Sequence, residues 1–286
     1  MLVSDPSRAE PCADDGLIDV NAQPPVTTYL REIWDRREYL ARVPLDDLRA
    51  QNFNTVLGNV WHLLNPTLQI GVYYLVFGVL LGTNRGIDNF LTFLAAGVFT
   101  YQFTQKSATR GASAITGNEG LIRSIRFPRA ILPLTTAITE LFAYLPALLV
   151  LYVVALATGE PIRATWVLVP LLIVPVQLLF NLGLAFFTAR AADLFRDVQN
   201  LLPFVFRIVF YLSGILYSVE ARVETPRLRT LFTLNPIYAF ASLVRSAVLG
   251  LPLNVAHIWS ALGWTTALLL LGFLWFRAGE HTYGRG

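Results

Sequence analysis

Three stretches of the chain are long, apolar and free of charged residues, and they constrain the fold more than any other feature. They lie between Arg49 and Arg85, between Arg163 and Arg190, and between Arg245 and Arg277. A transmembrane helix needs about 20 predominantly apolar residues to cross the hydrocarbon core of a bilayer. Charged residues make up 14% of the chain, against about 25% in ordinary soluble domains. We therefore predict an all-α integral membrane protein, and we exclude collagen, a disordered protein, a disulfide scaffold and a cytosolic enzyme.

The apolar segments predict six membrane spans, over residues 60–82, 90–111, 130–157, 165–189, 198–217 and 256–276. Prolines inside several of these spans are acceptable, because neighbouring helices and polar side chains can satisfy the freed carbonyls. Most of the 22 basic residues fall in segments on the same side of the membrane as both termini. Since basic loops face the cytoplasm, we expect a multi-pass plasma-membrane protein with both ends cytoplasmic.

Four regions follow from this pattern. Residues 1–25 are acidic and proline-rich without apolar periodicity, which predicts a disordered cytoplasmic tail; they show no signal-peptide pattern. Residues 26–58 precede the membrane domain, residues 59–277 form the six spans, and residues 278–286 form a second cytoplasmic tail.

Residues 26–43 have the spacing of an amphipathic helix. Apolar residues recur on one side and arginines fall mostly on the other, with Leu30, Ile33 and Trp34 against Arg31 and Arg37. This pattern is typical of a helix in the membrane interface, although a soluble helix packed on the protein remains an alternative. We expect Pro44 to end this helix and a second helix to cover about residues 45–57.

The segment between spans five and six, residues 218–255, contains one short predicted helix. Asn235 and Pro236 indicate its start, and Gly250 its end. A helix of this length, roughly 21 Å, is too short to span a bilayer. Its apolar face would hold Ile237, Phe240, Ala241, Val244 and Val248, with Ser242, Arg245 and Ser246 opposite. We predict a re-entrant or outer-face helix; a simple extracellular loop is the alternative.

Polar residues inside the predicted spans are the sharpest functional signal. Glu140, Asn181 and Arg207 lie at similar depths in spans three, four and five. An unpaired charge at that depth costs several kcal/mol, so we expect a polar layer in which Arg207 and Glu140 pair or face a water-filled path. An ion pair that only orients the helices is equally compatible. An arginine on a path would suit a diphosphate, because its planar fork matches phosphate oxygens.

Aromatic residues cluster in spans one, two and five. Sugar rings can stack on aromatic faces and hydrogen-bond to tyrosine hydroxyls, so a glycan path is one interpretation, and packing or an interfacial belt is the other. The predicted path residues, besides Glu140 and Arg207, are Tyr73, Tyr101, Tyr211 and Tyr217.

Motifs for several chemistries are missing from the sequence. There is no GxxxxGK[ST] phosphate loop, no HExxH and no GxSxG, and Cys12 is the single cysteine. The positive charges lie at the ends of apolar runs rather than on a basic face with interleaved aromatics, which argues against nucleic-acid binding. We expect no catalytic residues, no metal site and no cofactor in this chain.

Several short motifs occur in an order that resembles one transporter family. They are Thr55-Val56-Leu57-Gly58, Trp61, Leu64, Pro66, Phe77-Gly78, Asn118, Leu121-Ile122-Arg123, Phe127-Pro128-Arg129, Ile131-Leu132-Pro133, Arg196-Asp197-Val198 and Asn235-Pro236. The chain resembles the ABC-2 permeases that export lipid-linked polysaccharides, the group of O-antigen, teichoic acid and galactan exporters, and most of all the mycobacterial-type galactan exporter permeases. Ser213-Gly214 departs from the Ser-Pro that relatives often have.

The resemblance implies a homodimer with two copies of a separate ATPase subunit, which would hold ATP and Mg²⁺, and export of a polyprenyl-diphosphate-linked glycan. It also implies a cytoplasmic coupling element that docks on the ATPase, with the residues Asn118, Glu119, Leu121, Ile122, Arg123, Phe127 and Arg129. A short helix with Leu121, Ile122 and Ile125 between arginines has the character of a docking surface; an ordinary positive-inside loop is the alternative.

The resemblance further implies that the helix over residues 26–43, with Arg31, Trp34 and Arg37, is a gate for lipid-linked substrate in contact with membrane lipids. Two other functions remain open at this point. One is a membrane enzyme acting on polyprenyl-linked sugars, and the other is an ABC-2 permease for a drug or a lipid.

Overall fold

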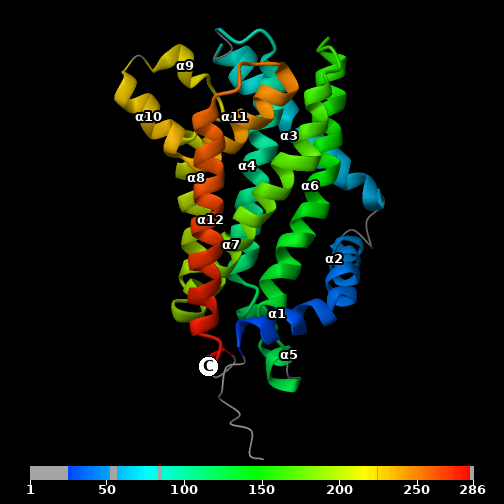
Figure 1. Cartoon of the computed structure of the whole chain (residues 1–286). Helices are drawn as coiled ribbons and strands as arrows, with labels where there is room; N and C mark the ends of the chain where they lie inside the picture. Colours follow the sequence, from blue (N-terminus) through cyan, green and yellow to red (C-terminus); the bar gives the residue numbers. More distant parts are fainter. Residues whose placement is uncertain (1–24, 52–56, 83–85, 126, 224, 284–286) are drawn as a thin grey trace, which may run out of the picture.

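The protein is a bundle of long helices, seen in a computed structural model that describes residues 25–51, 57–82, 86–125, 127–223 and 225–283 (Figure 1). No strand occurs among these residues. The elements in chain order are α1 (Val26–Asp35), α2 (Arg37–Gln51), η1 (Gly58–Val60), α3 (Trp61–Tyr73), η2 (Tyr74–Leu80), α4 (Phe90–Ala112), η3 (Thr116–Asn118), α5 (Glu119–Ser124), α6 (Ile131–Ala157), η4 (Ala164–Val167), η5 (Val169–Ile173), α7 (Val174–Leu194), α8 (Val198–Leu212), α9 (Val219–Arg222), α10 (Pro226–Leu234), α11 (Pro236–Leu249) and α12 (Val255–Ala278). The predicted tail over residues 1–25 and the motif residues Thr55 and Val56 lie outside this part, apart from Pro25.

The six predicted spans correspond to six helical segments. Four of them are long and apolar enough to cross a membrane: Trp61–Leu80, Ile131–Ala157, Ala164–Leu194 and Val255–Ala278. Helix α4 has 23 residues but carries polar groups in its second half, and α8 has only 15 residues, ending at Leu212 rather than at the predicted Tyr217. The all-α membrane architecture is confirmed.

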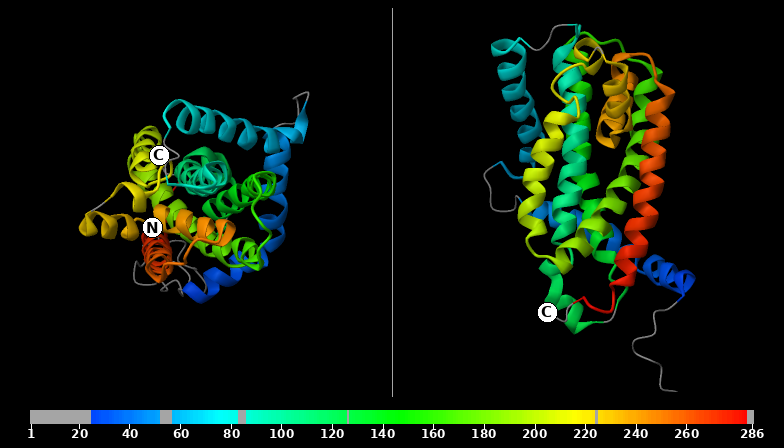
Figure 2. Two further views of the ribbon diagram at one scale, coloured as in Figure 1. Left: turned by 90° about the horizontal axis from the view of Figure 1, so that it is seen from above. Right: turned by 90° about the vertical axis from the view of Figure 1, so that its left-hand side faces the viewer.

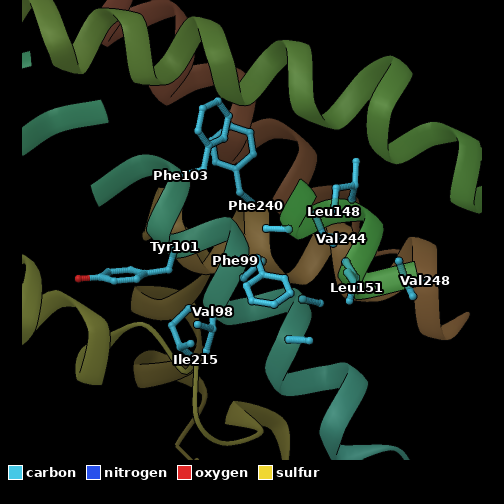
Figure 3. Packing of buried hydrophobic residues seen from close by; sticks show 14 of the residues in the cluster. Val98, Phe99, Tyr101, Phe103, Leu148, Leu151, Ile215, Phe240, Val244 and Val248 are labelled. Carbon is cyan, nitrogen blue, oxygen red and sulfur yellow. The ribbon is translucent and has the colours of Figure 1, made fainter. Parts of the chain in front are cut away.

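Helix α4 lies at the centre of the bundle. Viewed from above in Figure 2, it is surrounded by neighbouring helices, and it packs against α3, α6, α7, α8 and α11. Asn89 starts it, because its side-chain oxygen accepts a hydrogen bond from the Thr92 N–H (3.2 Å). Figure 3 shows Val98, Phe99 and Phe103 of α4 among apolar side chains from α6 and α11. This core fixes the position of every other span.

Two glycines allow α7 and α12 to cross at very close range. A Cβ atom on Gly183 would collide with the backbone of Leu268 and Leu269, and one on Gly272 would collide with the carbonyl oxygen of Gly183. Small residues at crossings let membrane helices approach closely and gain dispersion contacts. The last span is therefore held tightly against the centre of the bundle.

Helices α10 and α11 form an inserted pair, bent by 87° at Asn235. Asn235 caps α11 by accepting hydrogen bonds from the N–H groups of Ile237 and Tyr238, and Gly250 ends it with a φ of 70°. These predicted boundaries are confirmed, and the bend fits the prediction of a re-entrant helix. The predicted polar face is wrong, since Ser242 and Arg245 are buried together with the apolar residues. Helix α11 packs against α4 and α12, and only Pro236, Ser246 and Leu249 among its residues are partly exposed.

The break between the two N-terminal helices lies at Arg36, about two turns before the predicted break at Pro44. Helix α1 ends at Asp35 and α2 begins at Arg37, whereas Pro44 lies buried inside α2. A proline removes one backbone hydrogen bond and strains the preceding turn, but a packed environment can retain the helix. Helix α2 packs along α6, which supplies that environment.

A second, smaller core closes the end of the bundle that holds α1, α5 and the C-terminal residues, hereafter the terminal end (Figure 1). It joins Tyr29 of α1, Ile122 of α5 and Phe276 of α12. Tyr283 is also fully buried there, and its hydroxyl donates to the carbonyl of Phe276 (2.7 Å). The predicted C-terminal tail is therefore packed on the bundle as far as Tyr283.

The glycine crossing generates a stability prediction. Gly272→Leu should lower the free energy of unfolding by at least the roughly 1–3 kcal/mol typical of overpacking, because its side chain meets backbone rather than a movable side chain. Thermal unfolding in detergent measures the change. Gly263→Leu on the same helix is the matched control, since a Cβ there meets nothing within 4 Å. Equal melting temperatures for the two variants would contradict the close crossing.

Candidate functional site

One face of α4 carries a polar stripe in the half nearest the terminal end. Its members, spaced by three or four residues, are Gln102, Gln105, Lys106, Thr109 and Arg110, and all of them are partly or fully exposed. From Thr92 to Tyr101, by contrast, every residue of the same helix is buried. Lys106 lies roughly 9 Å along the axis from the last residue of α4. Such a stripe cannot face lipid without a large cost, so it lines either water or another protein surface.

Glu140 of α6 lies directly behind this stripe. Its carboxylate forms an ion pair with the Arg110 guanidinium at 2.6 Å, with exposed side-chain fractions of 1% for Glu140 and 46% for Arg110. Of the two alternatives that the sequence left open for Glu140, a pair with Arg207 is wrong. Helix α6 packs against α4, and it is α4 that presents a cation to it at this depth. Glu140 thus anchors Arg110 at the edge of the stripe.

The other predicted polar residues are separated from this pair. On α7, Asn181 is fully buried, and its side-chain atoms have no hydrogen-bond partner among the described residues. One turn earlier, Gln177 donates to the Thr100 carbonyl (2.8 Å) and to the Thr104 hydroxyl (3.0 Å) of α4. The buried side of α4 is therefore tied to α7 through Gln177, and the predicted single polar layer of Glu140, Asn181 and Arg207 does not form.

Arg207 is exposed on α8, roughly 13 Å along the axis from Val198. Its guanidinium lies 5.7 Å from the ring centroid of Phe204, which is also exposed. The opposite side of α8, with Phe206 and Phe210, packs on α4. The charged side chain thus projects from a short apolar helix, on the side turned away from the bundle.

The four predicted path tyrosines have different surroundings. Tyr101 is buried and donates to the Phe206 carbonyl (2.6 Å), so it packs α4 on α8 and does not line a path (Figure 3). Tyr73 is half-buried against Phe210. Tyr211 is exposed, and Tyr217 is half-buried near it, with its hydroxyl 3.4 Å from the Tyr211 carbonyl oxygen. Of the four tyrosines, Tyr211 is the one whose side chain is exposed.

The predicted coupling element forms a short helix at the terminal end. Glu119 begins α5 and forms ion pairs with Arg123 (3.5 Å) and with Arg196 in the turn before α8 (3.3 Å). Asn118 is half-buried and donates to the Ala114 carbonyl (2.9 Å). Side-chain contacts thus connect α5 to the start of α8.

The apolar side of α5 is not free for docking, contrary to the sequence argument. Ile122 is only 8% exposed, and Leu121 and Phe127 pack around it in the second core. Ile125 is exposed. Any partner would therefore meet Ile125 and the charged rim, which includes Glu119 and Arg123.

A hydrogen-bonded junction joins α1, the start of α6 and the C-terminal segment. The Glu280 carboxylate accepts hydrogen bonds from the Tyr29 hydroxyl (2.9 Å) and from the Arg129 N–H (2.8 Å). The same hydroxyl accepts a hydrogen bond from the Ala130 N–H (3.1 Å). Burial raises the pKa of Glu280 above its ordinary value, although both of its hydrogen bonds and the nearby arginines act in the other direction. Three segments distant in sequence are thereby tied at one carboxyl group.

Helix α1 is attached through Tyr29 and Ile33, whereas Leu30 and Trp34 are exposed. Arg31 and Arg37, also exposed, flank these apolar side chains. This is the predicted amphipathic helix, with its buried side on the bundle and an apolar edge outside.

Sequence reasoning missed Lys106, Arg110 and Glu280 as site residues. The signal for the first two was present, since polar residues recur at helical spacing within a predicted span. Glu280 lies in a segment without periodicity, and only the fold brings it to Tyr29. Among the described residues, no group of three or more His, Cys, Asp or Glu side chains could hold a metal ion.

The ion pair behind the stripe can be tested by double substitution. Arg110→Gln leaves the buried Glu140 carboxylate without its cation and should lower the free energy of unfolding by about 1–3 kcal/mol. This is less than the ~3–5 kcal/mol lost when a fully buried pair is broken, because water screens Arg110. Arg110→Gln/Glu140→Gln should recover most of that loss in thermal unfolding. Arg49→Gln is the control, because its pair with Asp46 is exposed on both sides and should contribute little. A double variant no more stable than Arg110→Gln would contradict the pairing.

The junction can be tested by deuterium exchange. Glu280→Ala removes two hydrogen bonds of about 1 kcal/mol each, so the backbone amides of α1 should exchange about tenfold or more faster. The exposed neighbour variant His281→Ala should leave them unchanged.

The pH dependence of stability gives a second measurement at Glu280. Because its pKa is raised by folding, the Glu280 carboxyl stays protonated to higher pH in the folded protein than in the unfolded chain. The free energy of unfolding should therefore fall as pH rises from below the ordinary glutamate pKa through the raised one. Glu280→Gln keeps an acceptor and should remove that fall; an unchanged pH profile would contradict the assignment.

Comparison with known proteins agrees with this architecture. The sequence profile of the family described as ABC-2 type transporter matches residues 47–249. The O-antigen export system permease protein RfbA of Myxococcus xanthus is 30% identical over 210 residues, which cover 73% of this chain and 79% of that protein. RfbA of Klebsiella pneumoniae is 27% identical over 212 residues (74% and 80%). The polysialic acid transport protein KpsM of Escherichia coli is 22% identical over 248 residues (83% and 92%). Because the family match covers well over half of its residues, this chain is a member of the ABC-2 type transporter family.

Proposed function

We propose that this chain is the membrane subunit of an exporter that moves a polyprenyl-diphosphate-linked polysaccharide, a cell-wall galactan, across the plasma membrane. The observation that carries the proposal is the polar stripe of α4 together with Arg207 of α8, both exposed within the membrane-spanning part of the chain. The polysaccharide class is supported by relatives named for O-antigen export and polysialic acid transport. The galactan and its polyprenyl link rest on the motif resemblance described above.

The exposed polar groups argue for a homodimer. A second copy facing α8 and the stripe of α4 would enclose Arg207 and Lys106 in a central, water-filled path, away from lipid. The same arrangement would bring Tyr211 toward the path and would cover exposed apolar residues of α8 such as Leu201 and Ile208. A hydrated polymer needs such a polar passage, and one copy alone does not enclose it.

The driving force would come from two copies of a separate ATPase subunit, which would hold ATP and Mg²⁺. With the terminal end in the cytoplasm, α5 and Ile125 face that subunit. Motion of α5 would reach α8 through the contact of Glu119 with Arg196, and it would reach α1 through the Glu280 junction. Nucleotide binding would thereby shift the dimer between closed and open states.

The lipid-linked substrate would enter beside α1. The exposed Leu30 and Trp34 suit the headgroup and acyl boundary of the inner leaflet, with Arg31 and Arg37 near lipid phosphates. Beyond α1, Lys106 and Arg110 provide cations at the depth that a diphosphate would reach on entering the path. No specific contact among the residues that the structure describes favours a second function.

Depletion of the chain in its native cell tests the function. The lipid-linked glycan should accumulate at the cytoplasmic face, and restoring the wild-type chain together with its ATPase should clear it. In depleted cells, the Lys106→Glu chain should export at least tenfold less glycan than the wild-type chain, because the substitution reverses a charge on the path. Arg42→Glu, on an exposed part of α2, is the control and should restore export fully. Accumulation of a drug or lipid, or sugar transfer by this chain alone, would contradict the proposal.

Cysteine cross-linking tests the dimer. In a Cys12→Ser background, Leu201→Cys on the exposed face of α8 should give a covalent dimer under mild oxidation in membranes. Leu274→Cys, equally exposed on α12, is the matched control and should stay monomeric. Cross-linking of both variants, or of Leu274→Cys alone, would place the interface elsewhere.

A further inference from the structure

We infer that a polar pocket at the end of the bundle opposite to the termini binds a saccharide unit. The cavity, of about 450 Å³, lies between residues 86–89, α9, α11 and the start of α12. Its size is in the range of about 300–1,000 Å³ typical of small-molecule sites. The inference deepens the proposed function and rests on it in one respect, since the saccharide would be a unit of the exported glycan at the outer face.

The pocket is lined by carboxylates that can accept hydrogen bonds from hydroxyl groups. Glu220 accepts from the Tyr238 hydroxyl (2.6 Å) and from the Ser218 hydroxyl (3.0 Å). Burial alone would raise the pKa of Glu220, but these hydrogen bonds hold it below its ordinary value. Glu160 and Asp88 line the same cavity, and Asp88 is exposed. An ionised carboxylate retains free lone pairs after two such bonds.

Arg245 supplies a fixed cation at the base of the pocket. Its side chain is 3% exposed and stacks on Phe93, 3.5 Å from the ring centroid. The guanidinium donates to the carbonyls of Phe93, Gly214 and Ile215 at 2.8–3.2 Å. Among the described residues no carboxylate lies within ion-pair distance of it, and three bonds leave two of its five N–H groups. Gly97 makes room for it, because a Cβ there would collide with the guanidinium.

His257 is the group that points to a ligand. It is 6% exposed and lies edge-on to Tyr238, with ring centroids 5.3 Å apart. Among the described residues no hydrogen bond to either ring nitrogen is seen, and neither nitrogen belongs to the fully enclosed polar atoms that lack a partner, so both are accessible from the cavity that the residue lines. An imidazole that is largely buried and has no protein partner can form hydrogen bonds with the hydroxyl groups of a ligand in the cavity.

The charges of the pocket select a neutral, polyhydroxylated ligand. The Arg163–Glu160 ion pair (2.9 Å) is neutral as a whole, and the two remaining carboxylates, Asp88 and Glu220, outnumber Arg245. An anion such as phosphate would be repelled by these two carboxylates. A saccharide can donate to the carboxylates and accept from the Arg245 and His257 N–H groups at the same time.

Saturation-transfer NMR on the purified full-length chain tests the pocket directly. The probes are di- to tetrasaccharides made by partial acid hydrolysis of the surface polysaccharide of the native cell, with inorganic phosphate as competitor. We expect binding by the wild type, and at least tenfold weaker binding by His257→Phe, which keeps the ring against Tyr238. Glu220→Gln keeps an acceptor for Tyr238 and should weaken binding similarly. His281→Phe, an exposed histidine at the terminal end, is the matched control.

Each outcome decides the inference. Saccharide binding that depends on His257 and persists in phosphate supports it. No binding by the wild type, equal binding by His257→Phe, or displacement by phosphate overturns it, provided that the variants keep the melting temperature of the wild type. Export is measured separately by depletion. If the chain exports glycan but binds no saccharide, the pocket proposal is wrong and the proposed function still stands.

Discussion

The hydrocarbon core of a membrane offers polar groups no hydrogen-bond partner, and the arrangement of α4 follows from that constraint. Its buried side places Thr100 and Thr104 against Gln177 of α7. Its outer edge places Arg110 against Glu140 of α6. Lys106 remains exposed, so in one copy of the chain this cation is not shielded from lipid. The requirement that shapes the interior of the chain therefore also argues for a second copy around a water-filled path.

The spans and caps could be predicted because they depend on local sequence. Long apolar runs have few alternatives to a membrane helix, and the predicted span over 130–157 differs by one residue from α6. Asn235 and Gly250 mark the ends of α11 because their backbone roles are local. The amphipathic character of α1 could also be predicted, since it depends only on the spacing of residues within one helix.

The site could be predicted only in part, because its pairings depend on which helices become neighbours. Glu140 has a partner, as its burial cost requires, but the sequence did not show that α4 would be nearer than α8. Arg245 seemed to belong to a polar face, yet Gly97 and the carbonyls of Gly214 and Ile215 create a buried place for it. Ile122 had the character of a docking residue but packs inward. Each error concerns a contact between segments far apart in the sequence.

The two ends of the bundle differ in how they are held, and this difference bears on how motion would pass through the chain. At the centre, the backbone contact of Gly183 with Gly272 leaves α7 and α12 little freedom to slide. At the terminal end, α1 and the start of α6 are joined mainly through Glu280 and Tyr29, groups that can separate without breaking a helix. If α5 moves, the α7–α12 crossing is therefore expected to stay rigid, whereas the contacts at Glu280 and Tyr29 can separate. Displacement of α1 would cost a few hydrogen bonds and the burial of Tyr29 and Ile33, whereas displacement of α12 would disrupt close backbone packing, so α1 can move more readily than α12.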